Sequence, residues 1–239
     1  MRRRTFALAT AAGTALLAAA ALPATAQPTA PTAAANAASR PGVTEGSVSA
    51  ADLLAKVTNC SQISNGKYRT DEETSATVPV CGKKNAVFWK ADMDIDCDGQ
   101  VTAKCNKDTD PWFQDDTRYH QSDGKPLNAE KLPYVVVPSV SGIWNFESAG
   151  IKGGGVVAII YKNKVEYAVV GDTGPEKIIG EASYAAAKGL GIDPDPATGG
   201  AESGVTYILF KNSKASPIES HSEAVSRGEA LAKKFLQEN

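Results

Sequence analysis

The chain has 239 residues, of which 42% are hydrophobic and 22% charged, and its formal net charge is −2. This length fits one domain or two small ones. The slightly acidic charge argues against a nucleic-acid-binding protein, because such proteins are expected to be basic.

The first 26 residues have the features of a secretory signal peptide. Arginines occupy positions 2–4, an uncharged stretch runs over 5–22, and an Ala-x-Ala cleavage site ends at Ala26. Its removal takes three of the 25 basic side chains and none of the 27 acidic ones, so the net charge becomes −5. No later segment reaches the roughly 18 apolar residues of a membrane-spanning helix. We therefore expect a secreted, extracellular protein with no membrane anchor and no nucleic-acid partner.

The export route has two interpretations. The residues Arg3-Arg4-Thr5-Phe6 fit a twin-arginine signal, and they also fit the charged start of a general secretory signal. The sequence leaves both routes open.

Residues 27–49 are rich in Ala, Pro and Thr and hold few large apolar side chains. Such a segment cannot bury enough surface to offset the entropy lost on ordering, so we expect a disordered leader. Residues 50–239 are numerous enough to build one sizeable core, and we expect them to form a single domain.

Four cysteines follow the signal: Cys60, Cys81, Cys97 and Cys105. An even number in an exported chain indicates two disulfides, for which three pairings are possible. Pairing of nearest neighbours would join Cys60 to Cys81 and Cys97 to Cys105 and tie down loops. No two of the four form a Cys-x-x-Cys pair, which argues against a zinc site or a redox motif built on them.

Most of the domain has the pattern of β-strands separated by turns. The expected strands are 86–89 with the acidic run that follows, 134–137, 156–161, 165–170 and 205–210.

Three helices are expected around these strands. One follows Ser49, one starts near Glu181 and ends at Gly189, and one covers about 222–237 after a capping-box pattern. The long polar stretch over 99–131 is typical of a functional loop. The fold class is therefore a β-rich α+β protein with a barrel or sandwich core and a few peripheral helices.

The most unusual string is Asp92-Met93-Asp94-Ile95-Asp96-Cys97-Asp98-Gly99. Alternation with a period of two is typical of a strand, and it would place the carboxylates on one face and the apolar side chains on the other. Because such a row is self-repelling, it needs cations, donors or a function.

Three interpretations of this acidic run compete. Asp94, Asp96, Asp98 and Gly99 match the first positions of an EF-hand calcium loop, but Cys105 stands where the bidentate Glu is required. The run could also be a solvated acidic face without a ligand. The interpretation that we favour is the floor of a cleft for a cationic ligand.

A second acidic motif combines Asp172, at the end of a strand, with Glu181, nine residues later at a helix start. Two carboxylates that project into one cleft are what glycoside hydrolysis requires. Alternatively, Asp172 supports the turn and Glu181 favours the helix N-terminus. A helix N-terminus lowers a carboxyl pKa, so a general acid at this position would need desolvation or Asp172 to outweigh it.

Other side chains add one ligand candidate. Each of the three tryptophans could stack on a sugar ring or fill the core, and Trp112, next to Pro111 in the polar loop, is the best candidate for stacking. The two histidines, His120 and His221, lie in polar surroundings and are expected at the surface. Because no serine has a Gly-x-Ser-x-Gly context, a serine hydrolase is disfavoured.

Taken together and in order, four segments of this chain resemble the fungal-type chitosanases of glycoside hydrolase family 75. The segments are Lys90-Ala91-Asp92-Met93-Asp94-Ile95-Asp96-Cys97-Asp98-Gly99, Pro133-Tyr134-Val135-Val136, Tyr167-Ala168-Val169-Val170-Gly171-Asp172-Thr173-Gly174-Pro175 and Ile179-Gly180-Glu181-Ala182-Ser183. The resemblance covers about residues 51–211 and leaves out the C-terminal helix.

The resemblance implies an endo-acting hydrolase that cleaves β-1,4 bonds of chitosan with inversion, with Asp172 and Glu181 as its essential acids. The same Asp172 and Glu181 motifs are similar to those of double-psi barrel proteins that act on glycans, including lytic transglycosylases and expansins. That likeness implies a double-psi-type barrel core and makes Glu181 the proton donor.

We therefore expect a secreted, monomeric chitosanase with one catalytic domain over 50–239 and no metal or organic cofactor. Glu181 is the expected general acid, and Asp172 is the expected general base or its support. Asp94 or Asp96 is the reserve base. The expected ligands of the cationic polysaccharide are Asp92, Asp94, Asp96 and Trp112.

Two other functions stay open at this point. A lytic transglycosylase-like enzyme that cleaves peptidoglycan would need the acid but no base. An expansin-like glycan-binding module, with or without calcium, would bind polysaccharide without creating new reducing ends.

Overall fold

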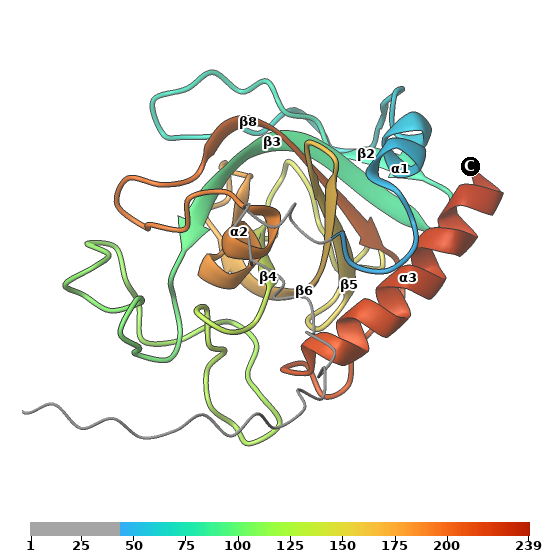
Figure 1. Cartoon of the computed structure of the whole chain (residues 1–239). Coiled ribbons are helices and arrows are strands. Elements are labelled where there is room, and N and C mark those ends of the chain that lie inside the picture. Colours follow the sequence, from blue (N-terminus) through green and yellow to red (C-terminus); the bar gives the residue numbers. More distant parts are fainter. Residues whose placement is uncertain (1–43) are drawn as a thin grey trace, which may run out of the picture. The chain divides into compact units, whose positions relative to one another are not determined.

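Six strands close into a barrel in the order β3–β7–β4–β6–β5–β8, and β8 pairs back with β3 (Figure 1). The computed structural model describes residues 44–239, so the expected signal peptide over 1–26 and most of the expected leader over 27–49 lie outside the described residues. The barrel confirms the β-rich α+β class, and closure leaves its strands without a free edge. The barrel strands are β3 (Ala86–Asp96), β4 (Tyr134–Pro138), β5 (Val156–Tyr161), β6 (Lys164–Gly174), β7 (Glu181–Ser183) and β8 (Ala201–Phe210).

The remaining elements surround this barrel. Two short strands, β1 (Ser61–Gln62) and β2 (Cys81–Lys83), extend the sheet beside β3. The helices are α1 (Ala50–Lys56), α2 (Tyr184–Leu190) and α3 (His221–Glu238). Within the described residues, none of these helices combines the length and the hydropathy that a membrane crossing requires.

Strand alternation divides the core into two buried clusters. Trp89, Val135 and Tyr207 belong to a cluster to which all six barrel strands contribute. Tyr167 and Phe210, which belong to the other cluster, lie on the strand faces that α1 and α3 cover. The strand pattern therefore produces a filled barrel with α1 and α3 packed on its outside, while the buried side chains of α2 join the first cluster.

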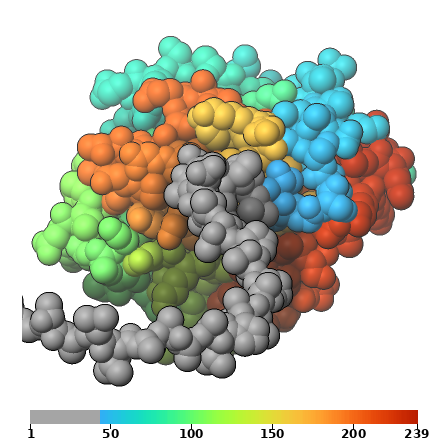
Figure 2. Space-filling model, viewed as in Figure 1, coloured from blue at the N-terminus to red at the C-terminus, as the bar shows by residue number. Residues whose placement is uncertain are grey.

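Helix α3 packs closely on the outside of β6 and β5. A Cβ at Gly228 would lie only 2.3 Å from the ring of Tyr167, so the glycine allows this approach. Phe235 packs edge-on against Phe210, with ring centroids 6.2 Å apart. In Figure 2 the blue N-terminal part of the described chain lies against the red α3, where Ser47 donates a hydrogen bond to Glu229.

Two elements differ from the sequence prediction. Strand β6 continues through Asp172 to Gly174, where a turn was expected. Glu181 lies in β7, and the expected helix begins three residues later because Ser183 accepts a hydrogen bond from Ala186 N and caps α2. The other expected strands and helices are present, with Ser49 and Ser220 as the N-caps of α1 and α3.

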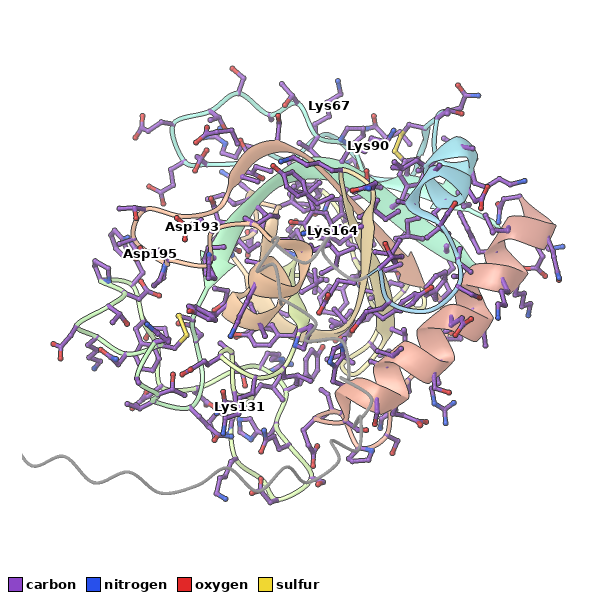
Figure 3. The ribbon with its side chains drawn as sticks, viewed as in Figure 1. Lys67, Lys90, Lys131, Lys164, Asp193 and Asp195 are labelled. Atoms are coloured by element: carbon purple, nitrogen blue, oxygen red, sulfur yellow. A yellow bond between two sulfur atoms is a disulfide. The ribbon has the colours of Figure 1, made fainter. Side chains whose placement is uncertain are left out.

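Both disulfides have the nearest-neighbour pairing. Cys60 pairs with Cys81, and Cys97 pairs with Cys105 (Figure 3, yellow bonds). The first joins the segment after α1 to β2. The second fastens the end of β3 to the polar loop, so it fixes the chain beside the acidic run.

We predict that Phe235→Ala destabilises the protein by about 3–5 kcal/mol, because it removes a buried aromatic ring that the neighbouring side chains cannot replace. Urea unfolding followed by circular dichroism measures this change. The matched control is Gln237→Ala on the exposed side of the same helix, which is expected to change the stability by less than about 0.5 kcal/mol. Equal changes in the free energy of unfolding for the two substitutions would show that the contact between Phe235 and Phe210 does not stabilise the protein.

Candidate active site

A cavity of about 570 Å³ lies where the ends of β3, β7, β4 and β6 run side by side. Its walls come from these strand ends, from the polar loop after β3 and from the loop before β8. The loop before β8 also carries Asp193 and Asp195, which are labelled in Figure 3. Six carboxylates line the cavity: Asp94, Asp96, Asp98, Asp110, Asp172 and Glu181.

Parallel pairing between β3 and β7 positions Glu181. The register sets Glu181 beside Asp94. Gly174 leaves room for the side chain, since a Cβ there would lie 2.6 Å from Glu181 Oε2. The pKa of Glu181 is raised to about 7, mainly by burial and then by the neighbouring carboxylates of Asp94, Asp98 and Asp172, in that order. Glu181 can therefore carry a proton near neutral pH.

A bulge in β6 positions Asp172. The pairing with β4 passes from Val170 to Asp172 and skips Gly171. A Cβ at Gly171 would lie 2.6 Å from Tyr134 Cβ, so a larger residue would disturb this packing. The bulge thus turns the carboxyl of Asp172 toward the cavity that Glu181 also lines.

Asp172 is buried and held by the backbone. Its Oδ1 accepts hydrogen bonds from Arg118 N at 2.8 Å and from Thr173 N at 2.7 Å. Burial raises the pKa of Asp172, and these two N–H groups oppose the rise. The polar loop therefore fixes this carboxyl group through the backbone of Arg118, a contact between residues 54 positions apart that no local pattern predicts.

Asp96 and Asp98 form a connected pair at the end of β3. Asp98 N donates to Asp96 Oδ1 at 2.6 Å, and Gln114 N donates to Asp98 Oδ1 at 2.6 Å. Burial raises the pKa of Asp98 to about 6. Burial also raises the pKa of Asp96 well above its ordinary value, and the charges of Asp98, Glu181 and Asp172 add to that rise.

The structure corrects the expected position of Asp92. The alternation predicts it on the cleft floor with Asp94 and Asp96, but Asp92 is only 5% exposed and does not line the cavity. Gly180 packs on it, since a Cβ at that glycine would lie 2.0 Å from Asp92 Oδ1. This Oδ1 is buried without a hydrogen-bond partner among the described residues. Asp92 therefore lies beneath the cleft.

One group of carboxylates next to the cleft is close enough to share a cation. Oxygen atoms of Asp71, Asp92 and Asp94 all lie within 4.8 Å of one another. This group is not an EF-hand loop, because Asp92 and Asp94 belong to strand β3 and Asp71 comes from a different part of the chain.

Trp112 lines the cavity as expected and is 84% exposed. Its backbone N–H donates to Asp110 Oδ1 at 2.8 Å, so the buried Asp110 shapes the turn that presents the indole. No sequence pattern singles out Asp110, because the polar loop has no periodicity that distinguishes one Asp from another.

Residues 93–235 match the family model described as fungal chitosanase of glycosyl hydrolase group 75. The chain is also similar to endo-chitosanase C of Aspergillus oryzae, with 31% identity over 134 residues that cover 54% of this chain and 33% of the relative. An endo-chitosanase of Aspergillus oryzae is 32% identical over 143 residues, which cover 54% of this chain and 58% of the relative.

The chain therefore spans between one third and three fifths of the length of these relatives. The family match over 93–235 is shifted toward the C-terminus relative to the resemblance over 51–211. It therefore includes most of α3, which that resemblance leaves out.

We predict that Asp92→Asn stabilises the protein near pH 8 and not near pH 4. Burial raises the folded-state pKa of Asp92 from 3.8 to about 8. Between pH 3.8 and about 8, Asp92 is protonated in the folded protein and ionised in the unfolded chain. The free energy of unfolding therefore falls as the pH rises, and the contribution of protonated Asp92 is lost as the pH rises through the folded-state pKa. The expected gain near pH 8 exceeds about 1 kcal/mol, the free energy of one pKa unit.

Urea unfolding of both proteins at the two pH values measures the difference. The control is Asp195→Asn in the loop before β8, where hydrogen bonds from Ala197 N and Thr198 N lower the pKa of the exposed Asp195. This control is expected to bring no gain near pH 8. An effect of Asp92→Asn that is the same at both pH values contradicts the prediction.

Proposed function

Because this chain belongs to the family of chitosanases of glycosyl hydrolase group 75, we propose that residues 50–239 form a single catalytic domain of a secreted endo-chitosanase. The proposed reaction is hydrolysis of β-1,4 bonds between glucosamine units of chitosan with inversion of the anomeric carbon. The observation that carries the proposal is the raised pKa of Glu181, about 7, in a cavity that Asp172 also lines.

Glu181 is the proposed general acid. A general acid must hold its proton at the working pH and transfer it to the leaving glycosidic oxygen as the bond breaks. Burial beside Asp94, Asp98 and Asp172 meets this requirement. The position of Glu181 in β7 also removes the objection from a helix N-terminus, because α2 begins only at Tyr184.

Asp172 is the proposed general base, or the support of the group that acts as base. In an inverting enzyme the base removes a proton from the water that attacks the opposite face of the sugar. Asp172 suits this role because two backbone N–H groups hold its carboxyl and favour the charged form. Asp94 and Asp96 line the same cavity and remain the reserve candidates.

The acidic strand supports the assignment of the substrate. Asp94, Asp96 and Asp98 offer negative charge to the ammonium groups of glucosamine, which neutral chitin lacks. The exposed ring of Trp112 offers an apolar surface for the face of a sugar. Together these groups favour a cationic polysaccharide.

The test of the activity compares two glycans. The protein is incubated with chitosan and with peptidoglycan, new reducing ends are measured, and NMR identifies the first anomer formed. Reducing ends from chitosan alone, first formed as the α-anomer, support the proposal. Cleavage of peptidoglycan would instead indicate a lytic transglycosylase-like enzyme, and binding without cleavage would indicate an expansin-like module.

We predict that Glu181→Gln and Asp172→Asn each lower kcat on chitosan by at least about 10²-fold, because the amides keep the shape of the carboxyl groups but cannot transfer the proton. Reducing-end assays and circular dichroism measure turnover and folding. The matched control is Asp193→Asn, an exposed Asp of the loop before β8 that does not line the cavity. If Asp172→Asn keeps normal turnover, Asp172 is not the base, and the same substitution at Asp94 and Asp96 identifies its replacement.

We also predict that KM for chitosan rises with salt, because added ions screen exposed charges over a Debye length of about 8 Å at physiological ionic strength. Initial rates at low and high sodium chloride measure the effect, and the double substitution Asp94→Asn with Asp98→Asn should reduce it. A KM that does not depend on salt would mean that the acidic strand does not attract the substrate.

A further inference from the structure

Glu45, Glu166 and His221 meet at the end of β6 opposite to Asp172. Glu45 precedes α1, Glu166 is the third residue of β6, and His221 is the first residue of α3. One side-chain atom from each residue lies within 4.8 Å of the other two. Glu166 and Asp172 are six positions apart along β6, which is roughly 20 Å at about 3.3 Å per residue, so this cluster is separate from the cleft.

Glu166 has the fewest partners of the three groups in this cluster. Glu166 is only 5% exposed, and no hydrogen bond to its carboxylate is found among the described residues. His221 Nε2 is also buried, and its nearest partner is Glu45 Oε1 at 3.0 Å, with which it forms an ion pair when the imidazole is protonated. The Glu45 side chain accordingly raises the pKa of His221. Zinc would replace that proton and also reach the carboxylate of Glu166. A buried carboxylate and a buried ring nitrogen that point to the same place are costly unless another group satisfies them.

The spacing of the three atoms fits a tetrahedral metal site. His221 Nε2 lies 3.0 Å from Glu45 Oε1 and 3.9 Å from Glu166 Oε1. Ligand atoms bound to tetrahedral zinc at about 2.0–2.2 Å lie roughly 3.3–3.6 Å from one another. These two distances bracket this range, and one oxygen atom of Glu45 lies within 4.8 Å of one of Glu166. Side-chain movements of about 1 Å would therefore bring all three groups onto one ion.

The surroundings hold the two carboxylates in place. Tyr167 N donates to Glu45 Oε2 at 2.6 Å, which leaves Oε1 directed toward His221. A Cβ at Gly189 would lie 2.2 Å from Glu166 Oε2, so the glycine makes room for this carboxylate while Oε1 is the oxygen nearer to His221. Hydrogen bonds to the second oxygen of a ligating carboxylate are common around protein metal ions.

Lys164 is a further cation near this place and is labelled in Figure 3. Its charge lowers the pKa of Glu166, but no ion pair within 4.0 Å joins Lys164 to Glu45 or Glu166 in the described chain. Lys164 therefore does not occupy the position between the three ligand atoms.

We propose that Glu45, Glu166 and His221 bind a zinc ion, with water as the fourth ligand, and that this ion ties the N-terminal segment and α3 to the barrel. An imidazole beside two carboxylates favours zinc over calcium or magnesium, which prefer oxygen ligands alone. All four cysteines form disulfides, so no thiol competes for the metal. The role is structural, and it is independent of the proposed hydrolysis.

The test is calorimetric titration of zinc chloride into the purified protein after treatment with a chelator, at a pH slightly above neutral. The expected result is one ion per chain and a rise of Tm that the chelator reverses. His221→Gln and Glu166→Gln should each weaken zinc binding by more than about tenfold and abolish the rise of Tm. The matched control is His120→Gln, which removes the other histidine of the chain and should bind zinc normally.

Zinc-edge X-ray absorption of the wild-type protein adds a readout that does not depend on the folding of variants. One imidazole and otherwise oxygen ligands support the site. The proposal is overturned if the wild-type protein binds no zinc, if it binds calcium or magnesium in preference, or if zinc binding is lost with His120→Gln and kept with His221→Gln. Chitosan hydrolysis at moderate temperature should be the same with and without chelator, so failure here leaves the proposed function unaffected.

Discussion

The short pairing between β3 and β7 is the contact on which the cleft depends. Only three residue pairs join these strands, and they set Asp94 beside Glu181 and Asp96 beside Ser183. Ser183 also donates to Leu132 O, accepts from Tyr134 N and caps α2. One serine therefore holds the neighbouring strand β4 and the N-terminus of α2. Glu181, the proposed acid, lies two positions before this serine.

Charge is the second constraint on the cleft. Carboxylates around one cavity cannot all be ionised at low cost, and burial raises the pKa of Asp98 to about 6 and that of Glu181 to about 7. The ammonium groups of a bound chitosan would favour the charged forms of the carboxylates that they touch. Ionised neighbours would in turn help Glu181 to keep its proton. Binding of a cationic substrate and protonation of Glu181 are thus coupled through the charges of the same carboxylates.

Local patterns predicted the parts of the structure that depend on neighbouring residues. Alternation indicated strand β3, and the serine caps marked the starts of α1 and α3. The burial of Asp92 was not predictable, because Gly180 covers it from a distant part of the chain. The sequence predicts that the helix starts near Glu181, whereas it starts after Ser183. Ser183 is held as the cap by Leu132 and Tyr134, which are distant in sequence, so no local pattern marks this start. The roles of Asp172 and Glu181 came from the family resemblance and not from their spacing alone.

The disulfide between Cys97 and Cys105 is the covalent link between the end of the acidic strand and the polar loop. It closes the start of the polar loop, and that loop supplies Gln114 N to Asp98, Arg118 N to Asp172 and the ring of Trp112. Without this disulfide the polar loop would lose the covalent link beside Asp98, and the positions of Gln114 N and Arg118 N would depend on noncovalent contacts alone.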